Sequence, residues 1–230
     1  PAEWREPVPL LKAGLYAPGR HSPAIEDVSR DWRDSAPIIP IVFYRALVQA
    51  GDTAPVDALL AALAERSANP LPIYVNSLKD AVSGAFVAQL MSEHLPSAIL
   101  NCTGFALLRP GAPADGTPFD GTDCPVLQVI LSGGTIEAWI DGSSGLAARD
   151  LAMNVALPEM DGRIITRAIS FKSSHVFDGA TQVAVVRNEP EPSRVAFVAD
   201  LALALTRLRR TPAAKRRIAV ILANYPNRDG

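Results

Sequence analysis

Residues 38–46 read Ile-Ile-Pro-Ile-Val-Phe-Tyr-Arg-Ala, a run of β-branched and aromatic residues that is typical of a buried strand. Thr53 then offers an N-cap to a helix whose apolar residues fall on one face. Further strand-like runs occupy residues 71–75, 98–101 and 125–131 and alternate with helical patterns. Such alternation argues for a parallel sheet that is covered on both faces. We therefore expect an α/β doubly wound, mainly parallel and flavodoxin-like domain.

The segments on either side of this domain carry different patterns. Residues 1–37 are rich in proline and poor in apolar repeats, which predicts an irregular lead-in. Residues 38–162 contain the expected α/β domain. Residues 163–230 predict two strands, at 163–171 and 181–186, that can form a hairpin across residues 173–179. A long helix that Ser193 caps and a last strand at residues 217–222 follow. We expect this small additional β/α part to complete the domain or to link it to the next one.

The composition narrows the class of protein. The chain has 230 residues, of which 48% are hydrophobic and 20% are charged, and this composition is typical of a globular protein that buries a core. A net charge of −2 argues against nucleic acid as a partner, because phosphate backbones attract strongly basic surfaces. No apolar run has the length of a membrane span, and the first residues do not resemble a signal peptide. We expect a cytoplasmic protein whose Cys102 and Cys124 are reduced core thiols.

Polar residues follow the predicted strands. Ligands bind beyond the carboxyl ends of the strands in an open parallel sheet, so these positions are candidate binding residues without any alignment. A cation there can pair with carboxylates of an acidic ligand, and an amide can form hydrogen bonds. The other interpretation is that the same residues are caps and turns of an ordinary domain. The candidate substrate-binding residues are Arg45, Gln49, Thr53, Lys79, Asn101 and Thr103.

Two carboxylates stand close together after a predicted helix. The helical pattern of residues 146–157 is expected to stop at Pro158, and Gly162 then turns the chain into the next strand. Glu159 and Asp161 lie between them and are our candidate catalytic residues, as proton acceptors or transient metal ligands. The alternative is structural, with salt bridges from these carboxylates to Arg163 or Arg167.

The sequence offers little support for a resident cofactor. His21, His94 and His175 have no zinc-ligand spacing, so we expect no metal site in this chain. No phosphate-binding Gly-x-x-x-x-Gly-Lys motif and no dinucleotide glycine pattern occur, so ATP or NAD binding by the chain itself has no support. A Gly-x-Ser-x-Gly elbow is absent as well, which leaves hydrolase chemistry without an anchor.

Two stretches point to a known family. Residues 155–162 read Val-Ala-Leu-Pro-Glu-Met-Asp-Gly, and residues 100–107 read Leu-Asn-Cys-Thr-Gly-Phe-Ala-Leu. Both resemble the large subunits of cobaltochelatase and of its relative magnesium chelatase, whose members carry the same acid in a Leu-Pro-Glu-hydrophobic-Asp-Gly context. Residues 42–45, 49–53 and 223–230 look like the cobalt branch.

The resemblance implies a function. It implies a fragment of the tetrapyrrole-binding large subunit of an ATP-dependent cobaltochelatase, which inserts Co(II) into the corrin hydrogenobyrinic acid a,c-diamide during cobalamin biosynthesis. Separate AAA+ motor subunits would use the ATP, and the remainder of the same polypeptide would complete the subunit, so we expect no activity from this piece alone. Two alternatives stay open: a magnesium chelatase fragment acting on protoporphyrin IX, and a non-catalytic flavodoxin-like scaffold or ligand-binding domain.

Overall fold

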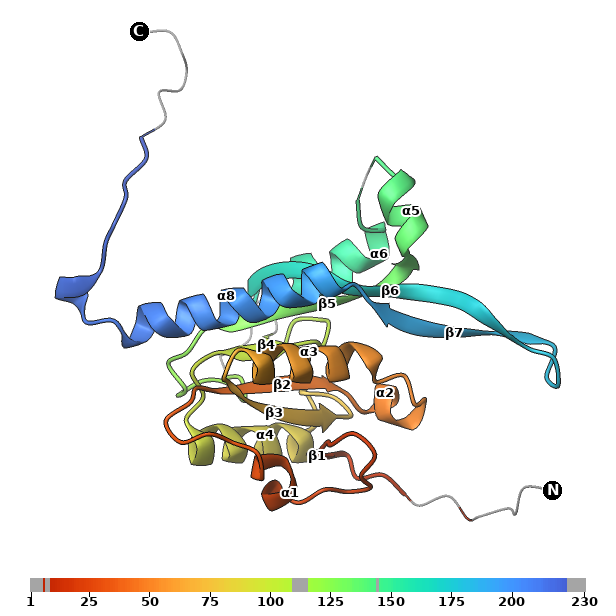
Figure 1. The fold of residues 1–230 in the computed structure, drawn as a ribbon, viewed down its shortest axis with the longest axis horizontal. Helices are drawn as coiled ribbons and strands as arrows, with labels where there is room; N and C mark the ends of the chain where they lie inside the picture. The colour runs from red at the N-terminus through yellow and green to blue at the C-terminus, as the bar shows by residue number, and fades with distance from the viewer. Residues whose placement is uncertain (1–5, 7–8, 109–115, 144, 223–230) are drawn as a thin grey trace, which may run out of the picture.

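The computed structural model describes residues 6, 9–108, 116–143 and 145–222, so the cobalt-like stretch at 223–230 lies outside the described residues. Within these residues, seven strands form one mixed sheet in the order β1-β3-β2-β4-β5-β6-β7. Figure 1 shows β1 at the bottom, and β5 and β6 above β2 and β3. The strands are β1 (Ala13–Leu15), β2 (Ile38–Tyr44), β3 (Asn69–Val75), β4 (Ile99–Asn101), β5 (Val126–Thr135), β6 (Ile164–Asp178) and β7 (Val183–Pro190).

The centre of the sheet is parallel, as the sequence predicts. β3, β2, β4, β5 and β6 are parallel neighbours, whereas β1 and β7 pair antiparallel at the two edges. Several strand boundaries differ from the prediction, two of them at the carboxyl ends of strands. β2 ends at Tyr44, because residues 45 and 46 already belong to the short helix α2 (Arg45–Gln49). β5 runs past its predicted end at residue 131, through Ser132-Gly133-Gly134 to Thr135, because β6 continues to pair with it.

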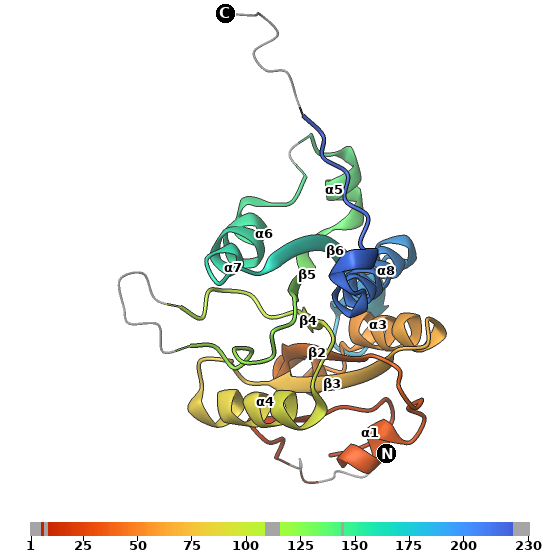
Figure 2. The same ribbon diagram turned by 90° about the vertical axis from the view of Figure 1, so that its left-hand side faces the viewer.

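Helices cover both faces of the sheet. α3 (Ala54–Glu65) and α8 (Pro192–Arg210) lie side by side on one face, and α4 (Ala81–His94) lies on the other, as Figure 2 shows. Alternation along β2 explains this arrangement, because Ile41 and Phe43 pack toward α3 and α8 while Val42 packs toward α4. An ion pair of 2.7 Å between Arg66 Nε and Asp200 Oδ1 also joins α3 to α8.

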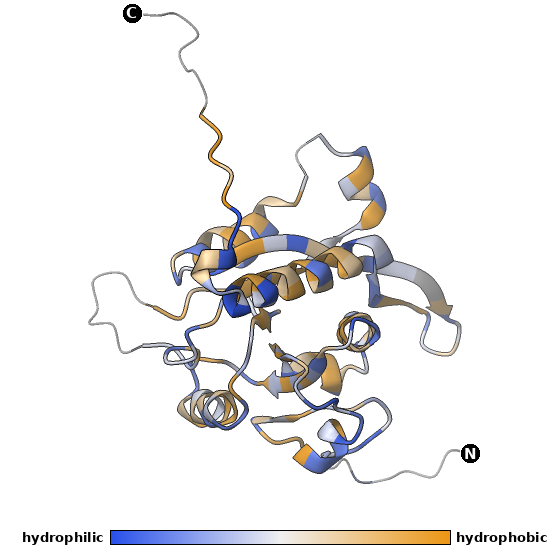
Figure 3. Ribbon diagram, turned by 60° about the vertical axis from the view of Figure 1, so that its left-hand side comes forward, coloured by the Kyte–Doolittle hydropathy of each residue, from blue (hydrophilic) through white to orange (hydrophobic). Residues whose placement is uncertain are grey.

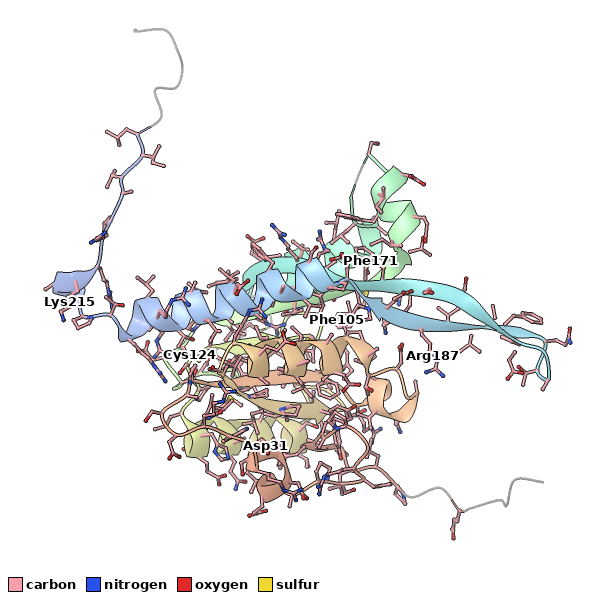
Figure 4. The ribbon with its side chains drawn as sticks, in the orientation of Figure 1. Asp31, Phe105, Cys124, Phe171, Arg187 and Lys215 are labelled. Carbon is pink, nitrogen blue, oxygen red and sulfur yellow. The ribbon has the colours of Figure 1, made fainter. Side chains whose placement is uncertain are left out.

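The remaining helices are short. α1 (Ile25–Ser29) packs near β3 and, with β1, gives regular structure to the lead-in that was expected to be irregular. After β5 come α5 (Ile136–Asp141), α6 (Ala148–Leu151), the π-helical turn η1 (Ala152–Ala156) and α7 (Leu157–Glu159). Phe171, labelled in Figure 4, packs under α5 with its ring centroid 5.5 Å from that of Trp139. A 3₁₀ turn, η2 (Ala213–Lys215), follows α8.

The C-terminal part departs from the prediction in three ways. β6 and β7 form the expected antiparallel hairpin, but it is longer than expected and projects beyond the helices in Figure 1. Glu191, not Ser193, caps α8, because its carboxylate accepts the backbone N–H of Arg194 at 2.9 Å. Residues 217–222 form no strand; they extend with their apolar side chains in solvent, the orange run near the C-terminus in Figure 3.

Candidate functional site

A step in the sheet creates the candidate site. β4 ends at Asn101, level with Gln128 of β5, whereas β5 and β6 continue well beyond this point. A cleft of about 610 Å³ opens at the step, beside the carboxyl ends of β2, β3 and β4. Its polar lining includes Gln49, Asn76, Arg149, Asp150, Asn154 and Lys172. The strand order reverses at β2, and ligands of open α/β sheets bind at such a position.

A second cavity adjoins the cleft. It measures about 770 Å³, and the N-terminal segment supplies much of its lining, including Leu10, Tyr16 and His21. Gln49, at the end of α2, lines both spaces. The cleft is the better candidate site, because several strand ends and the η1 turn meet there.

Asp150 forms one wall of the cleft and is almost fully buried. Its Oδ2 accepts the hydroxyl of Ser132 at 2.7 Å and the backbone N–H of Gly133 at 3.0 Å. Its Oδ1 lies 3.3 Å from the same backbone nitrogen and 3.5 Å from Nδ2 of Asn154. All these donors are neutral, and Asp150 forms no ion pair within the described part of the chain.

Asp52 joins the segment after α2 to the hairpin, two of whose side chains line the cleft. Its Oδ1 accepts the backbone N–H of Asn188 at 2.8 Å, and its Oδ2 accepts the side-chain amide of Asn188 at 2.6 Å. Lys172, which pairs with Asn188 across the hairpin, places its ammonium 3.4 Å from the same oxygen. The projecting hairpin therefore contributes two polar side chains to the cleft.

The predicted substrate-binding residues separate into three groups. Gln49 is exposed and lines the cleft, which fits the prediction. Arg45 turns toward the N-terminal segment, where its Nη1 donates to the carbonyl of Leu10 at 3.2 Å. Thr53 accepts the hydroxyl of Tyr16 at 3.0 Å, and Lys79 is exposed; neither belongs to the cleft lining.

Asn101 and Thr103 lie inside the protein. The carbonyl of Thr103 accepts Nδ2 of Asn101 at 3.2 Å, Nε2 of Gln128 at 2.9 Å and Nη1 of Arg163 at 3.2 Å. The hydroxyl of Thr103 donates to Oδ1 of Asn101 at 2.9 Å. Since internal groups occupy these polar atoms, the geometry supports a positioning role behind the cleft for both residues.

Glu159 and Asp161 point to different environments. Both oxygens of Asp161 accept the backbone N–H of Leu107, at 3.0 and 2.8 Å, and Oδ1 also accepts that of Leu108 at 3.0 Å. Arg163 Nη2 lies 2.7 Å from Oδ2, and both side chains are only 2% exposed. Burial lowers the pKa of Arg163, and the neighbouring carboxylate opposes that shift. Glu159 is exposed at the end of α7.

Pro158 does not stop the helix, contrary to expectation. The helix continues in π register, with the backbone N–H of Leu157 bonded to the carbonyl of Ala152, five residues back. In this register the missing N–H of proline would have reached the carbonyl of Met153. That carbonyl instead accepts the backbone N–H of Phe105 at 2.8 Å; Phe105 is labelled in Figure 4.

The two stretches that resemble the chelatases therefore pack against each other. Loop 103–108 is held by η1 through Phe105 on one side and by Asp161 and Arg163 on the other. Gly104 permits the close approach, because a Cβ there would lie 3.0 Å from Oδ1 of Asn154 and 3.1 Å from the carbonyl of Met153.

Sequence reasoning missed five polar residues of the cleft: Arg149, Asp150, Asn154, Lys172 and Asn188. The first three were placed within a helical run, and the sequence did not predict the π turn in it. The register of the predicted hairpin was the available signal for the other two. Among the residues that the structure describes, no three His, Cys, Asp or Glu side chains gather into a possible metal site. None of the helices described is long and apolar enough to cross a membrane.

Known proteins resemble the whole chain. It is 47% identical to an aerobic cobaltochelatase subunit CobN of Sinorhizobium sp. over 96% of its length, and 41% identical to that of Pseudomonas aeruginosa over 99%. A magnesium-chelatase subunit of Cereibacter sphaeroides is more distant, at 27% identity over 98% of this chain and 20% of its own. The chain spans only 18% of each of the two cobaltochelatase subunits.

A solved structure and a family model also match the chain. The catalytic subunit of cobaltochelatase from Mycobacterium tuberculosis matches with a TM-score of 0.71 and 28% identity, over 92% of this chain and 17% of that one. The model of the family described as CobN/Magnesium Chelatase matches residues 1–230. The chain therefore belongs to the CobN/Magnesium Chelatase family.

Proposed function

We propose that this chain is part of the tetrapyrrole-binding large subunit of an ATP-dependent cobaltochelatase, which inserts Co(II) into hydrogenobyrinic acid a,c-diamide in cobalamin biosynthesis. The observation that carries this proposal is the gap in identity, 47% and 41% to cobaltochelatase subunits against 27% to a magnesium-chelatase subunit. Cobalt and the corrin are the substrates of this reaction. The magnesium branch, with protoporphyrin IX, is the alternative that the experiment below tests.

The proposed assembly has further components. AAA+ motor subunits would bind and hydrolyse ATP, and the rest of the same polypeptide would enclose the tetrapyrrole. The absence of a phosphate-binding glycine motif from the sequence supports this division of labour. The chain's share of its relatives' length, 18%, also favours a role as one part of a larger cavity.

We infer different roles for Glu159 and Asp161, the acids at the end of α7 and just after it. Metal insertion requires that two pyrrole N–H protons leave the macrocycle, and a carboxylate can accept such a proton. Glu159 remains our proposed proton acceptor or transient metal ligand, because it is exposed. Asp161 positions loop 103–108, since its oxygens already bind two backbone N–H groups and a guanidinium.

The parallel part of the sheet is proposed to be flavodoxin-like. Numbered along the chain, the parallel strands have the order 2-1-3-4-5, which is the flavodoxin-like order. α3 and α8 share one face, as the first and last helices of such a fold do. In the third crossover, the described residues 102–108 and 116–125 form no helix, and β1 and β7 extend the two edges.

The function can be tested with the full-length polypeptide that contains this chain, combined with its motor subunits and ATP. Co(II) or Mg(II) is offered with either hydrogenobyrinic acid a,c-diamide or protoporphyrin IX, and insertion is followed by absorbance. We expect ATP-dependent insertion of cobalt into the corrin. Insertion of magnesium into protoporphyrin IX, without cobalt insertion, would assign the chain to the other branch.

A further inference from the structure

The cleft is bordered by a carboxylate oxygen whose hydrogen bonds are long. The two contacts of Asp150 Oδ1 are 3.3 and 3.5 Å long, at or beyond the usual range for N–H···O hydrogen bonds. Oδ2, by contrast, has short contacts with Ser132 and Gly133. Since the contacts of Oδ1 are long, a donor on a ligand that enters the cleft can replace one of them with a shorter hydrogen bond.

Amide side chains line the cleft that this oxygen borders. Asn154 lies next to Asp150, and Gln49 and Asn76 lie at the ends of α2 and β3. A primary amide both donates and accepts, so this lining matches a ligand that carries primary amides. Of the two cations that line the cleft, Lys172 is paired with Asp52, and Arg149 is exposed.

We propose that Asp150 and its amide neighbours form a subsite that selects a primary amide side chain of the tetrapyrrole against the corresponding carboxylate. This inference rests on the proposed function, because hydrogenobyrinic acid a,c-diamide carries amides where hydrogenobyrinic acid carries carboxylates. An amide N–H donates to Asp150 Oδ1. A carboxylate in the same place has no proton to donate and is repelled by the charge of Asp150. The exposed Arg149 is available for an acid group that both corrins share.

The difference between an amide and a carboxylate allows the cleft to discriminate strongly between the two corrins. A ligand that cannot donate the hydrogen bond leaves a buried polar group of the protein without a partner, and its binding is weakened for that reason. Repulsion between like charges adds to this effect, since specificity often depends on rejecting the wrong ligand. The subsite would thus prevent cobalt insertion into a corrin that has not yet been amidated, and the reaction that supplies the substrate must be an amidation of corrin carboxylates.

The test measures binding of both corrins to the full-length polypeptide by fluorescence quenching. The readout is the ratio of the Kd for hydrogenobyrinic acid to the Kd for its a,c-diamide. Asp150→Asn keeps the shape of the side chain and an acceptor but removes the charge. We expect it to lower the ratio by about tenfold or more, the scale of one hydrogen bond to a charged group. Asp141→Asn, which removes an exposed carboxylate on α5 outside the cleft, should leave the ratio unchanged.

A second variant keeps the proposal testable if Asp150→Asn does not fold. Gln49→Glu adds a carboxylate at an exposed position of the cleft and should raise the ratio by about threefold or more. An equal loss of affinity for both corrins in Asp150→Asn, or an unchanged ratio in Gln49→Glu, would overturn the subsite while leaving the proposed function intact. If the unmodified protein bound neither corrin, the proposed function and the subsite would both be wrong.

Discussion

Asp161 and Arg163 form a buried pair whose members depend on each other. With both side chains 2% exposed, removal of the carboxylate leaves a guanidinium in the interior without a counter-charge. We expect Asp161→Asn to lower the free energy of unfolding by about 3 kcal/mol or more, because breaking a buried pair is far costlier than breaking a surface one. Urea unfolding followed by circular dichroism measures this. Asp200→Asn, at the exposed partner of Arg66, is the control and should cost less than about 1 kcal/mol.

For Glu159 we predict the opposite, a slower reaction without a loss of stability. Because this side chain is exposed, Glu159→Gln should fold normally, with a melting temperature close to that of the unmodified protein. In the full-length polypeptide, loss of a positioned general base should slow cobalt insertion by about 10²-fold while corrin binding stays the same. Single-turnover insertion kinetics give the rate. An unchanged rate would exclude Glu159 as the proton acceptor.

The buried thiol of Cys102 leads to a prediction about its reactivity. Burial raises the pKa of its thiol to about 12, although the residue borders the cleft. The thiolate is the reactive form, so at pH 8 the native protein should react with iodoacetamide at Cys102 only as fast as it unfolds. Mass spectrometry of timed samples, with and without denaturant, follows the labelling. Rapid labelling of Cys102 in the native protein would show that the cleft admits solvent to this sulfur.

At the scale of elements, the contact between loop 103–108 and η1 should be sensitive to a single methyl group. A Cβ at Gly104 would press on a backbone carbonyl, which cannot turn away as a side chain can. We expect Gly104→Ala to lower stability by about 1–3 kcal/mol, the usual cost of overpacking. Gly179→Ala is the matched control, because Gly179 has open space around it and an ordinary φ. Equal melting temperatures for the two variants would contradict the close contact.

Elements also show what the sequence could and could not predict. Four of the five parallel strands, β2 to β5, were recognisable because buried central strands are continuous apolar runs. The π turn was not, since Pro158 breaks an α-helix but is tolerated once the hydrogen bonds shift to five residues back. The apolar residues 217–222 predict a strand, yet a strand forms only where a neighbour pairs with it, and none of the described strands does so.

The candidate site was predictable in part for a related reason. Position after a strand identified Gln49 correctly as a cleft residue, because chain topology alone places such residues at the sheet edge. Topology does not say whether a polar side chain faces solvent or the interior. Asn101 and Thr103 face inward, where they bond to each other and to Gln128 of β5, and the carbonyl of Thr103 also accepts Arg163. Spacing likewise could not separate Glu159 from Asp161, whose directions depend on the turn at Gly162.

At the scale of the molecule, the chain by itself should not perform the whole reaction. It has no phosphate-binding glycine motif in its sequence, and it spans 18% of each cobaltochelatase subunit to which it is compared. We expect residues 1–230 to show no ATP hydrolysis and no cobalt insertion, as measured by phosphate release and by corrin absorbance. Turnover by this chain alone would overturn its assignment as one part of a larger subunit.

Asp161 recognises loop 103–108 through backbone N–H groups, not through the side chains of Leu107 and Leu108. Exchange of those two side chains therefore requires no change in the acid. Arg163 and Gln128, in contrast, meet through their side chains at 2.9 Å. In an alignment of the family, covariation should thus be strong between positions 128, 161 and 163 and weak between position 161 and positions 107 and 108, although the distances are alike.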